Sequence, residues 1–292
     1  MMNGREIRIH SWGGLGSQLF ALGTAYQAHQ RIPFRKIVLV IHSSGVTFRS
    51  LELNFKNEWL RIEFVNDFKD LVEGAKTIPS SILFKFRRVP LILLNALGFM
   101  NSLNTDSEMK RLKPWVISIR GHYSHKKIDS DTLSFLAKIL EINLMREGWN
   151  STIGVHYRLG DLLTLESKSF ISEKSLVRQL VLVGGMYEID EIDVFTDSPG
   201  EAKQLLLPIG TNLNVISIET LATIKELIGH KVFVGTNSKI SIWITLFRLA
   251  ANPKSINYLP TKSRQELSRI LDNFSFWENL YFFDCKDKYS ST

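Results

Sequence analysis

Three short stretches carry the side chains best suited to chemistry, and each follows or contains an apolar run typical of a β-strand. The first is VHYRLGD, which contains His156, Arg158 and Asp161. Because side chains alternate along a strand, the imidazole and the guanidinium should point to the same face. The planar fork of an arginine matches the paired oxygens of a diphosphate. An Arg158–Asp161 ion pair beside a buried His156 is the structural alternative.

The second stretch, KVFVGTNSKISIW, places Thr236, Asn237 and Ser238 between an apolar strand and a helix. Free N–H groups and the positive end of the helix dipole make the start of such a helix a phosphate site. Plain N-capping is the alternative, because Asn and Ser are preferred caps in any case. Trp243, further along the same helix, fits a core position better than a binding surface.

The third stretch, IDVFTDS, ends a strand and continues with Thr196, Asp197 and Ser198. In dinucleotide-binding folds a carboxylate near the end of a strand accepts hydrogen bonds from ribose hydroxyls. The same residue can instead cap the helix that follows. Asp197 and Ser198 are therefore candidate ligand-binding residues, with helix capping as the alternative.

A fourth stretch near the N-terminus, HSWGGLGSQLF, breaks the first apparent strand abruptly and starts a helix at once. It offers little side chain, because three of its residues are glycines. Either a tight turn or a backbone that comes close to a ligand explains such a composition. The candidate residues of this loop are Gly13, Gly14, Gly16, Ser17 and Gln18.

Strand-like and helix-like segments alternate along the chain, which favours α/β layers with mainly parallel sheets. Several strands are almost continuously apolar, as expected where helices cover both faces of a sheet. We expect strands at 6–10, 36–42, 61–65, 115–121, 152–158, 192–196, 213–218 and 231–235, and helices at 17–31, 129–145, 172–186, 198–207, 219–228 and 238–252.

The length of 292 residues suits two domains better than one. The polar segment EGWNS at 147–151 is the best candidate boundary, so we expect one domain at 1–150 and a second at 151–292. Each should be Rossmann-like, and the central cleft that the two face is where a ligand should bind.

Charge and composition narrow the function classes. The net charge of +7 suits nucleic acid, a phosphorylated small molecule or a membrane face. The sequence lacks a dense Lys/Arg stripe interleaved with aromatics and lacks zinc-finger spacing, so we expect no nucleic-acid partner. One cysteine, Cys285, excludes an internal disulfide and a multi-cysteine metal site. With no secretory signal evident, we expect a cytoplasmic protein.

The most apolar run, VPLILLNALGFM at 89–100, is too short to span a bilayer. It follows the basic segment KFRR, and such a pairing can rest on an anionic membrane surface, here the inner face of the membrane. We expect a buried helix with a solvated basic start, and we keep peripheral membrane contact as the alternative.

The order and spacing of the four stretches resemble those of the α-1,2-fucosyltransferases, glycosyltransferase family 11. That family shows a GGLGNQLF-like start, an HxRxGD motif, an FSD-type strand end and a late SNSxFSWW-like motif. The corresponding stretches of this chain are GGLGSQLF, HYRLGD, FTDS and TNSKISIW. The segment IRGHYSHKK at 119–127 is similar to the family's glycine–aromatic stretch. HxRxGD is the most specific of these motifs, since it marks the wider set of transferases that use GDP-fucose.

The resemblance implies a GT-B-like architecture, with the acceptor on the first domain and the donor, GDP-L-fucose, on the second. It also implies inverting transfer of L-fucose to a hydroxyl, O2 of a galactose, in a glycan acceptor such as an O-antigen unit. No metal and no cofactor would be needed. Arg158 would be the catalytic residue that binds the diphosphate, His156 would contact the guanine side, and the loop at 13–18 would approach donor and acceptor. The other donor contacts would come from Asp161, Asp197, Ser198, Thr236, Asn237 and Ser238.

Departures from the family pattern leave the transferred sugar open. Ser17 stands where asparagine is usual, Ser198 where a second aspartate is common, and KISIW where the family has FSWW. A transferase for another GDP-6-deoxysugar, such as GDP-colitose, is therefore the main alternative. A non-catalytic nucleotide-sugar-binding module is the other, and the intact HYRLGD motif argues against it. No carboxylate is marked as the catalytic base, and the sequence does not define the oligomeric state.

Overall fold

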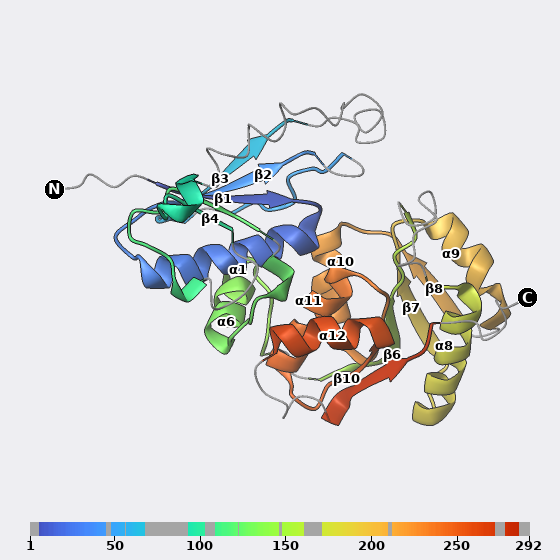
Figure 1. The fold of residues 1–292 in the computed structure, drawn as a ribbon. Coiled ribbons are helices and arrows are strands. Elements are labelled where there is room, and N and C mark those ends of the chain that lie inside the picture. The colour runs from blue at the N-terminus through green and yellow to red at the C-terminus, as the bar shows by residue number, and fades with distance from the viewer. Residues whose placement is uncertain are drawn as a thin grey trace, which may run out of the picture. The chain divides into compact units, whose positions relative to one another are not determined.

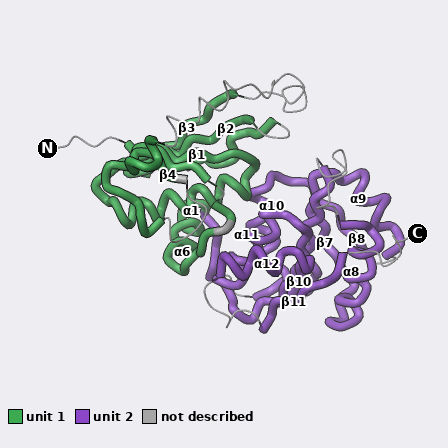
Figure 2. Tube along the Cα trace, viewed as in Figure 1, with its two compact units in different colours: residues 1–140 green, residues 141–292 purple. Residues whose placement is uncertain are grey.

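The computed structural model of the chain describes residues 6–44, 48–55, 57–67, 93–102, 109–121, 123–145, 148–160, 171–209, 212–271 and 278–285. The chain divides into two compact units, Met1–Leu140 and Glu141–Thr292 (Figure 2). The division falls earlier than the boundary expected at 150. Glu141 adopts a left-handed conformation with φ 55°, which ends the last helix of the first unit.

The first unit contains a five-stranded parallel sheet with the order β3-β2-β1-β5-β4. Its second strand, IVLVIH, is buried over its first five residues, which explains its nearly continuous apolar sequence. Figure 1 shows α1 running along one face of this sheet with α6 beside it. The elements are β1 (Ile7–Trp12), α1 (Leu15–Arg31), β2 (Ile37–His42), β3 (Leu60–Val65), β4 (Met100–Ser102), β5 (Ser118–Arg120), η1 (Tyr123–His125) and α6 (Ser130–Ile139).

The second unit contains a six-stranded parallel sheet with the order β11-β10-β9-β6-β7-β8. Counted along the chain within the unit, this is the strand order 3-2-1-4-5-6 of the dinucleotide-binding Rossmann fold. The elements are β6 (Asn150–His156), α8 (Glu173–Tyr187), β7 (Glu191–Phe195), α9 (Pro199–Leu206), η2 (Leu207–Ile209), β8 (Asn212–Ile216), α10 (Thr220–Leu227), β9 (His230–Gly235), α11 (Lys239–Ala251), β10 (Ile256–Pro260), α12 (Thr261–Ile270) and β11 (Leu280–Phe283).

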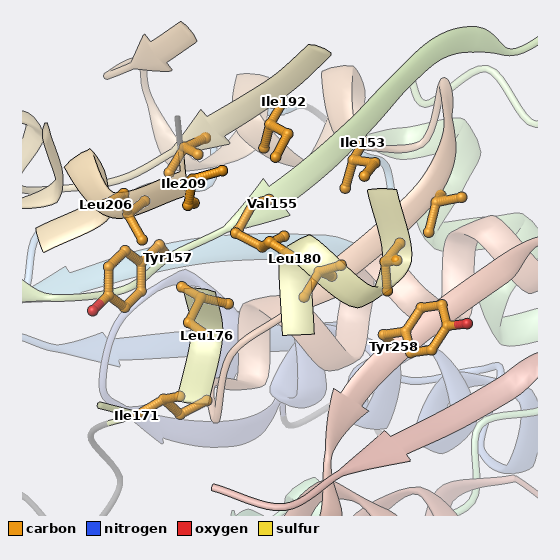
Figure 3. Close-up of a cluster of buried hydrophobic side chains, with 14 of the residues drawn as sticks. Ile153, Val155, Tyr157, Ile171, Leu176, Leu180, Ile192, Leu206, Ile209 and Tyr258 are labelled. Carbon is orange, nitrogen blue, oxygen red and sulfur yellow. The ribbon is translucent and has the colours of Figure 1, made fainter. Parts of the chain in front are cut away.

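The core of the second unit fixes which way each residue of β6 points. Val155 and Tyr157 lie in a buried cluster with Leu176 of α8 and Ile192 of β7 (Figure 3). Because side chains alternate along a strand, His156 faces the opposite side of the sheet. That side is covered by α11, whose hydroxyl-bearing first turn reaches the imidazole.

The α/β class and the strand–helix alternation are confirmed. Trp243 is fully buried, as expected for a core residue. Two elements are clearly shorter than expected. The strand expected at 115–121 begins only at Ser118, because the Val116 N–H donates to the Lys113 carbonyl and closes a turn before it. The helix expected at 129–145 ends at Ile139.

The buried helix expected at 89–100 is wrong for the part of this run that the structure describes. Residues 93–96 are helical, but Leu93 is 59% exposed and Leu97 is 53% exposed. Gly98, with φ 76°, then ends the helical turn and leads into β4. Within the described ranges, no helix is both long and apolar enough to cross a membrane.

Arg248, near the end of α11, ties this helix to the starts of neighbouring strands. Its guanidinium is fully buried and packs over the rings of Trp149 and Phe233. Burial lowers the pKa of Arg248 to about 9, so the group still carries its charge at neutral pH. The guanidinium donates to Oδ1 of Asn257 at 2.7 Å and to the carbonyl oxygens of Leu227, Ile228, His230, Lys231 and Ile256.

Replacing Arg248 with methionine should strongly destabilise the fold, because several buried acceptors lose their donor together. We expect Arg248→Met to lower the free energy of unfolding by more than about 3 kcal/mol. Urea denaturation followed by circular dichroism measures this change. The control is Arg178→Met on the exposed face of α8, which should change stability by less than about 0.5 kcal/mol. Equal denaturation midpoints for the two variants would contradict the assignment.

Candidate functional site

The carboxyl ends of β6, β7 and β9 lie side by side, at the point where the strand order of the second sheet reverses. His156, the last residue of β6, pairs with Phe195 of β7 and with Gly235 of β9. The predicted stretches around 156–161, 196–198 and 236–238 therefore continue from adjacent strand ends. In open α/β sheets this position is where ligands bind. The topology brings three of the four sequence-predicted stretches together.

His156 is buried and held in one orientation by the first turn of α11. Its Nδ1 lies 2.8 Å from the hydroxyl of Ser241, which itself accepts the N–H of Thr236 at 3.0 Å. The Ser241 hydroxyl thus links the imidazole to the backbone of the loop after β9. Burial, and then the charge of Arg158, lower the pKa of His156 to about 3. At neutral pH the ring is therefore uncharged.

Arg158 lies beyond the strand, because β6 ends at His156, two residues earlier than expected. Its backbone N–H donates to Oγ1 of Thr236 at 3.3 Å, so the backbone that carries the guanidinium is linked to the loop after β9. The side chain is half-buried. Its charge lowers the pKa of both His156 and Lys239.

Lys239, the first residue of α11, is a cation that the sequence reasoning did not select. Burial lowers the pKa of Lys239, the charge of Glu266 opposes this, and the charge of Arg158 adds to it. A positive charge at a helix N-terminus opposes the helix dipole, and a bound anion would offset that cost. The sequence signal was available, since the lysine directly follows the TNS segment.

The residues before α11 have separate roles. Ser238 is the N-cap, and its hydroxyl accepts the N–H of Ile240 at 3.2 Å, as the capping alternative predicts. Thr236 is buried, and its hydroxyl accepts the N–H of Arg158. Asn237 is half-buried, and its side chain has no hydrogen bond within the described part of the chain. Ligand contacts by these three residues remain a prediction, and Asn237 is the best placed of them.

Gly235 allows α11 to approach the end of β9 closely. A Cβ at this position would lie 2.6 Å from Cδ2 of Leu259 and 2.8 Å from Cβ of Ser241. Such distances are too short for any side chain without a shift of the helix. The absence of a side chain at Gly235 is therefore what lets the Ser241 hydroxyl reach His156.

Asp197 holds the loop that follows β6. Its Oδ1 accepts the N–H of Leu159 at 2.9 Å and the N–H of Gly160 at 3.0 Å. The helix-capping alternative is wrong, since Ser198 is the N-cap residue of α9 and makes no side-chain cap bond. A ribose contact by Asp197 or Ser198 stays a prediction. Asp161 lies outside the described residues.

The glycine-rich loop belongs to the first unit. Gly13 has φ 108°, a conformation that glycine adopts readily, and a Cβ there would meet the hydroxyl of Ser17 at 2.8 Å. Gln18 is buried, and its side-chain amide donates to the carbonyl of Ser50 at 2.9 Å. The first N–H of α1, at Leu15, donates to a carboxylate oxygen of Glu52 at 2.9 Å. The tight-turn interpretation thus accounts for Gly13 and Gln18, while ligand approach by Gly14, Gly16 and Ser17 remains a prediction.

No family model matches the chain, and no curated protein matches it. Several solved structures resemble it at low similarity. Escherichia coli heptosyltransferase WaaC with ADP shows 14% identity and a TM-score of 0.42, over 87% of this chain and 86% of that one. POFUT1 in complex with GDP shows 12% identity and a TM-score of 0.43, over 88% and 98%. A family 9 glycosyl transferase from Veillonella parvula shows 10% identity and a TM-score of 0.42, over 89% and 82%. Values this low establish neither a family nor a function.

A methyl group at Gly160 should loosen the loop after β6. A Cβ there would lie 3.0 Å from the carboxyl carbon of Asp197, so the carboxylate must move and release two backbone N–H groups. We expect Gly160→Ala to lower stability by about 1 kcal/mol or more, measured as the melting temperature. The matched control is Gly200→Ala in α9, where a Cβ meets nothing within 4 Å. If both variants have the melting temperature of the wild type, Asp197 does not hold the loop.

Proposed function

We propose that the protein is an inverting glycosyltransferase that moves L-fucose from GDP-L-fucose to a hydroxyl of a glycan, O2 of a galactose. The observation that carries the proposal is one grouping at the strand switch point. It comprises the buried His156, which is hydrogen-bonded to Ser241 of α11, Arg158, whose N–H is bonded to Thr236, and Lys239, the first residue of α11. A nucleotide diphosphate needs hydrogen bonds for its base and positive charge for its phosphates. The resemblance of HYRLGD to fucosyltransferase motifs supports guanine and fucose in particular.

Positively charged side chains of this protein stabilise the negative charge that the reaction develops. Negative charge grows on the diphosphate as its bond to the sugar breaks. Arg158 offers a two-pronged donor for that charge, and Lys239 and the N–H groups of α11 add to it. Removing one preorganised contact of this kind costs about 10²–10³ in rate. A metal ion supplies such stabilisation in other enzymes, and we propose that none is required here.

Peripheral membrane contact is also part of the proposal. The exposure of Leu93 and Leu97 supports it, because these residues follow the basic segment KFRR in the sequence. Apolar side chains beside basic ones can lie on an anionic lipid surface. A glycan acceptor carried on a lipid would be within reach of a protein held there.

Nucleotide binding tests the guanine assignment directly. We expect GDP to raise the melting temperature while UDP at the same concentration does not, because HYRLGD resembles the motif whose histidine contacts the guanine side of GDP-fucose. Ligand at about 100 times its dissociation constant adds roughly 2.7 kcal/mol of stability. Equal shifts with GDP and UDP would contradict the guanine assignment.

Transfer from GDP-L-fucose to a β-galactoside should be unchanged by EDTA, because the proposed reaction requires no metal ion.

Arg158→Lys separates a diphosphate ligand from a structural ion pair. Lysine keeps the positive charge but loses the planar fork. If the fork holds the leaving diphosphate, kcat should fall about 10²-fold or more while the melting temperature is retained. The control is Arg178→Lys on the exposed face of α8, which should match wild type in both measurements. Normal turnover with a clearly lowered melting temperature in Arg158→Lys would show that the role is structural.

A further inference from the structure

Two histidines and an aspartate form a hydrogen-bonded chain near the carboxyl ends of three neighbouring strands in the first unit. Nδ1 of His10, on β1, lies 2.9 Å from Nε2 of His42, at the end of β2. Nδ1 of His42 lies 2.7 Å from Oδ2 of Asp67, which follows β3. The other carboxylate oxygen of Asp67 accepts the N–H and the hydroxyl of Ser44. The chain thus runs from a fixed carboxylate to His10.

The direction of these hydrogen bonds follows from the carboxylate. Burial alone would raise the pKa of Asp67, but hydrogen bonds from His42 and Ser44 outweigh it and lower that pKa, so the group is ionised. An ionised carboxylate only accepts, so Nδ1 of His42 carries a proton. Nε2 of His42 is then the acceptor for the Nδ1 proton of His10. Nε2 of His10 is left with its lone pair, and nothing in the described part of the chain is hydrogen-bonded to it.

The surroundings keep His10 uncharged. Burial is the largest influence, followed by the charge of Arg120, the electrostatic effect of His42 and the charge of Arg8, and together they lower the pKa of His10 to about 4. Glu63 opposes this effect and is itself paired with Arg8. An uncharged imidazole with an available lone pair is a proton acceptor at physiological pH.

An exposed aromatic ring lies beside the hydrogen-bonded residues His10, His42 and Asp67. Trp12, the last residue of β1, is 40% exposed and stacks on His42, with ring centroids 4.6 Å apart and planes 8° from parallel. Tyr123 donates to the carbonyl of His10 at 2.8 Å, which fixes the backbone between the histidine and the tryptophan. A solvent-facing indole is a flat apolar surface on which a sugar ring can lay its C–H face. A base and a sugar platform therefore occupy the same strand end.

We propose that His10 is the general base that deprotonates the acceptor hydroxyl, and that Trp12 is the platform for the acceptor sugar. His42 and Asp67 act as positioning residues that fix the tautomer of His10; His42 also receives the proton that His10 passes on. This role rests on the proposed function, and it supplies the base for which the sequence marked no carboxylate. The acceptor is accordingly a carbohydrate hydroxyl.

The proton balance is complete within these residues. As the acceptor oxygen forms its bond to the anomeric carbon, the bond from that carbon to the diphosphate breaks and its electron pair leaves with GDP. The hydroxyl proton moves to Nε2 of His10, and the Nδ1 proton of His10 moves to Nε2 of His42. The resulting imidazolium of His42 is stabilised by Asp67, as in other chains of imidazole and carboxylate.

Metal binding is a different use of histidines and aspartates, and this geometry does not favour it. The imidazole nitrogens of His10 and His42 face each other, and the second nitrogen of His42 faces Asp67. They do not converge on a common point, as metal ligands must. Across the described residues, no group of three or more His, Cys, Asp or Glu side chains could hold a metal ion.

Three variants test the proposal. His10→Gln removes the base, and Asp67→Asn removes the charge at the half-exposed end of the chain, where folding should be little affected. The matched control is His29→Gln, whose ring stacks on Trp59 elsewhere in the same unit. With GDP-L-fucose and methyl β-galactoside as substrates, we expect kcat to fall about 10²-fold or more in the first two variants. The thermal shift with GDP should stay at its wild-type value in all three, and His29→Gln should turn over normally.

The pH profile distinguishes a proton relay from a structural contact. Protonation of the histidine chain should produce the acid limb of kcat in the wild type. Asp67→Asn removes the negative charge that favours the protonated chain, so the acid limb should move to lower pH as the plateau falls. Arg8, Glu63, Arg120 and His42 are unchanged in this variant. A fall in the plateau without movement of the limb would assign Asp67 a structural role and overturn the relay.

The remaining outcomes separate this proposal from the function on which it rests. Wild-type turnover in His10→Gln, with the GDP shift intact, overturns the role of His10 alone. A wild-type protein that neither binds GDP nor transfers sugar overturns the proposed function and this role with it. Nitrogen-15 NMR of the imidazoles supplies a measurement independent of substrate. It should show the proton of His10 on Nδ1, and a proton on Nε2 instead would exclude the relay.

Discussion

The close packing of α11 against the ends of β6 and β9 is the constraint on which the second unit depends. Gly235 permits the approach, Ser241 converts it into a hydrogen bond to His156, and Arg248 secures the other end of the helix. The whole stretch from Ile240 to Leu249 is buried, so the helix has little freedom to move. A helix fixed at both ends presents its N-terminus at one defined place, which is what an electrostatic site requires.

The two units each contain a buried histidine, and the two histidines have different hydrogen-bonding partners. Each has a histidine near the carboxyl end of its first strand, and burial lowers the pKa of each. His156 faces the hydroxyl of Ser241, which belongs to a helix. His10 faces a second histidine backed by Asp67, which leaves Nε2 of His10 an acceptor. The same residue type near the end of a first strand is thus given a different hydrogen-bonding partner in each unit.

Most strand positions and the grouping of strand-end residues could be predicted from the sequence, because buried parallel strands read as apolar runs and their ends meet at one edge. The strands β4, β10 and β11 and the helix α12 were not expected. The role of Asp197 could not, since it depends on pairing with backbone N–H groups far along the chain. Lys239 could have been predicted, because it directly follows the TNS segment at the start of a helix. Both EIRIH and KIVLVIH end in histidine, but the sequence does not show that the two strands are adjacent. No pattern could have joined Asp67 to them.

Two residues that fix this structure, Arg248 and Asp197, bind mostly main-chain atoms. Arg248 donates to five carbonyl oxygens, and Asp197 accepts from two N–H groups. Main-chain acceptors and donors are the same whatever residue carries them. The segments around Leu227 and Lys231 can therefore drift in sequence while the anchoring residue stays constant. Divergence of this kind erases similarity between relatives and leaves the architecture in place.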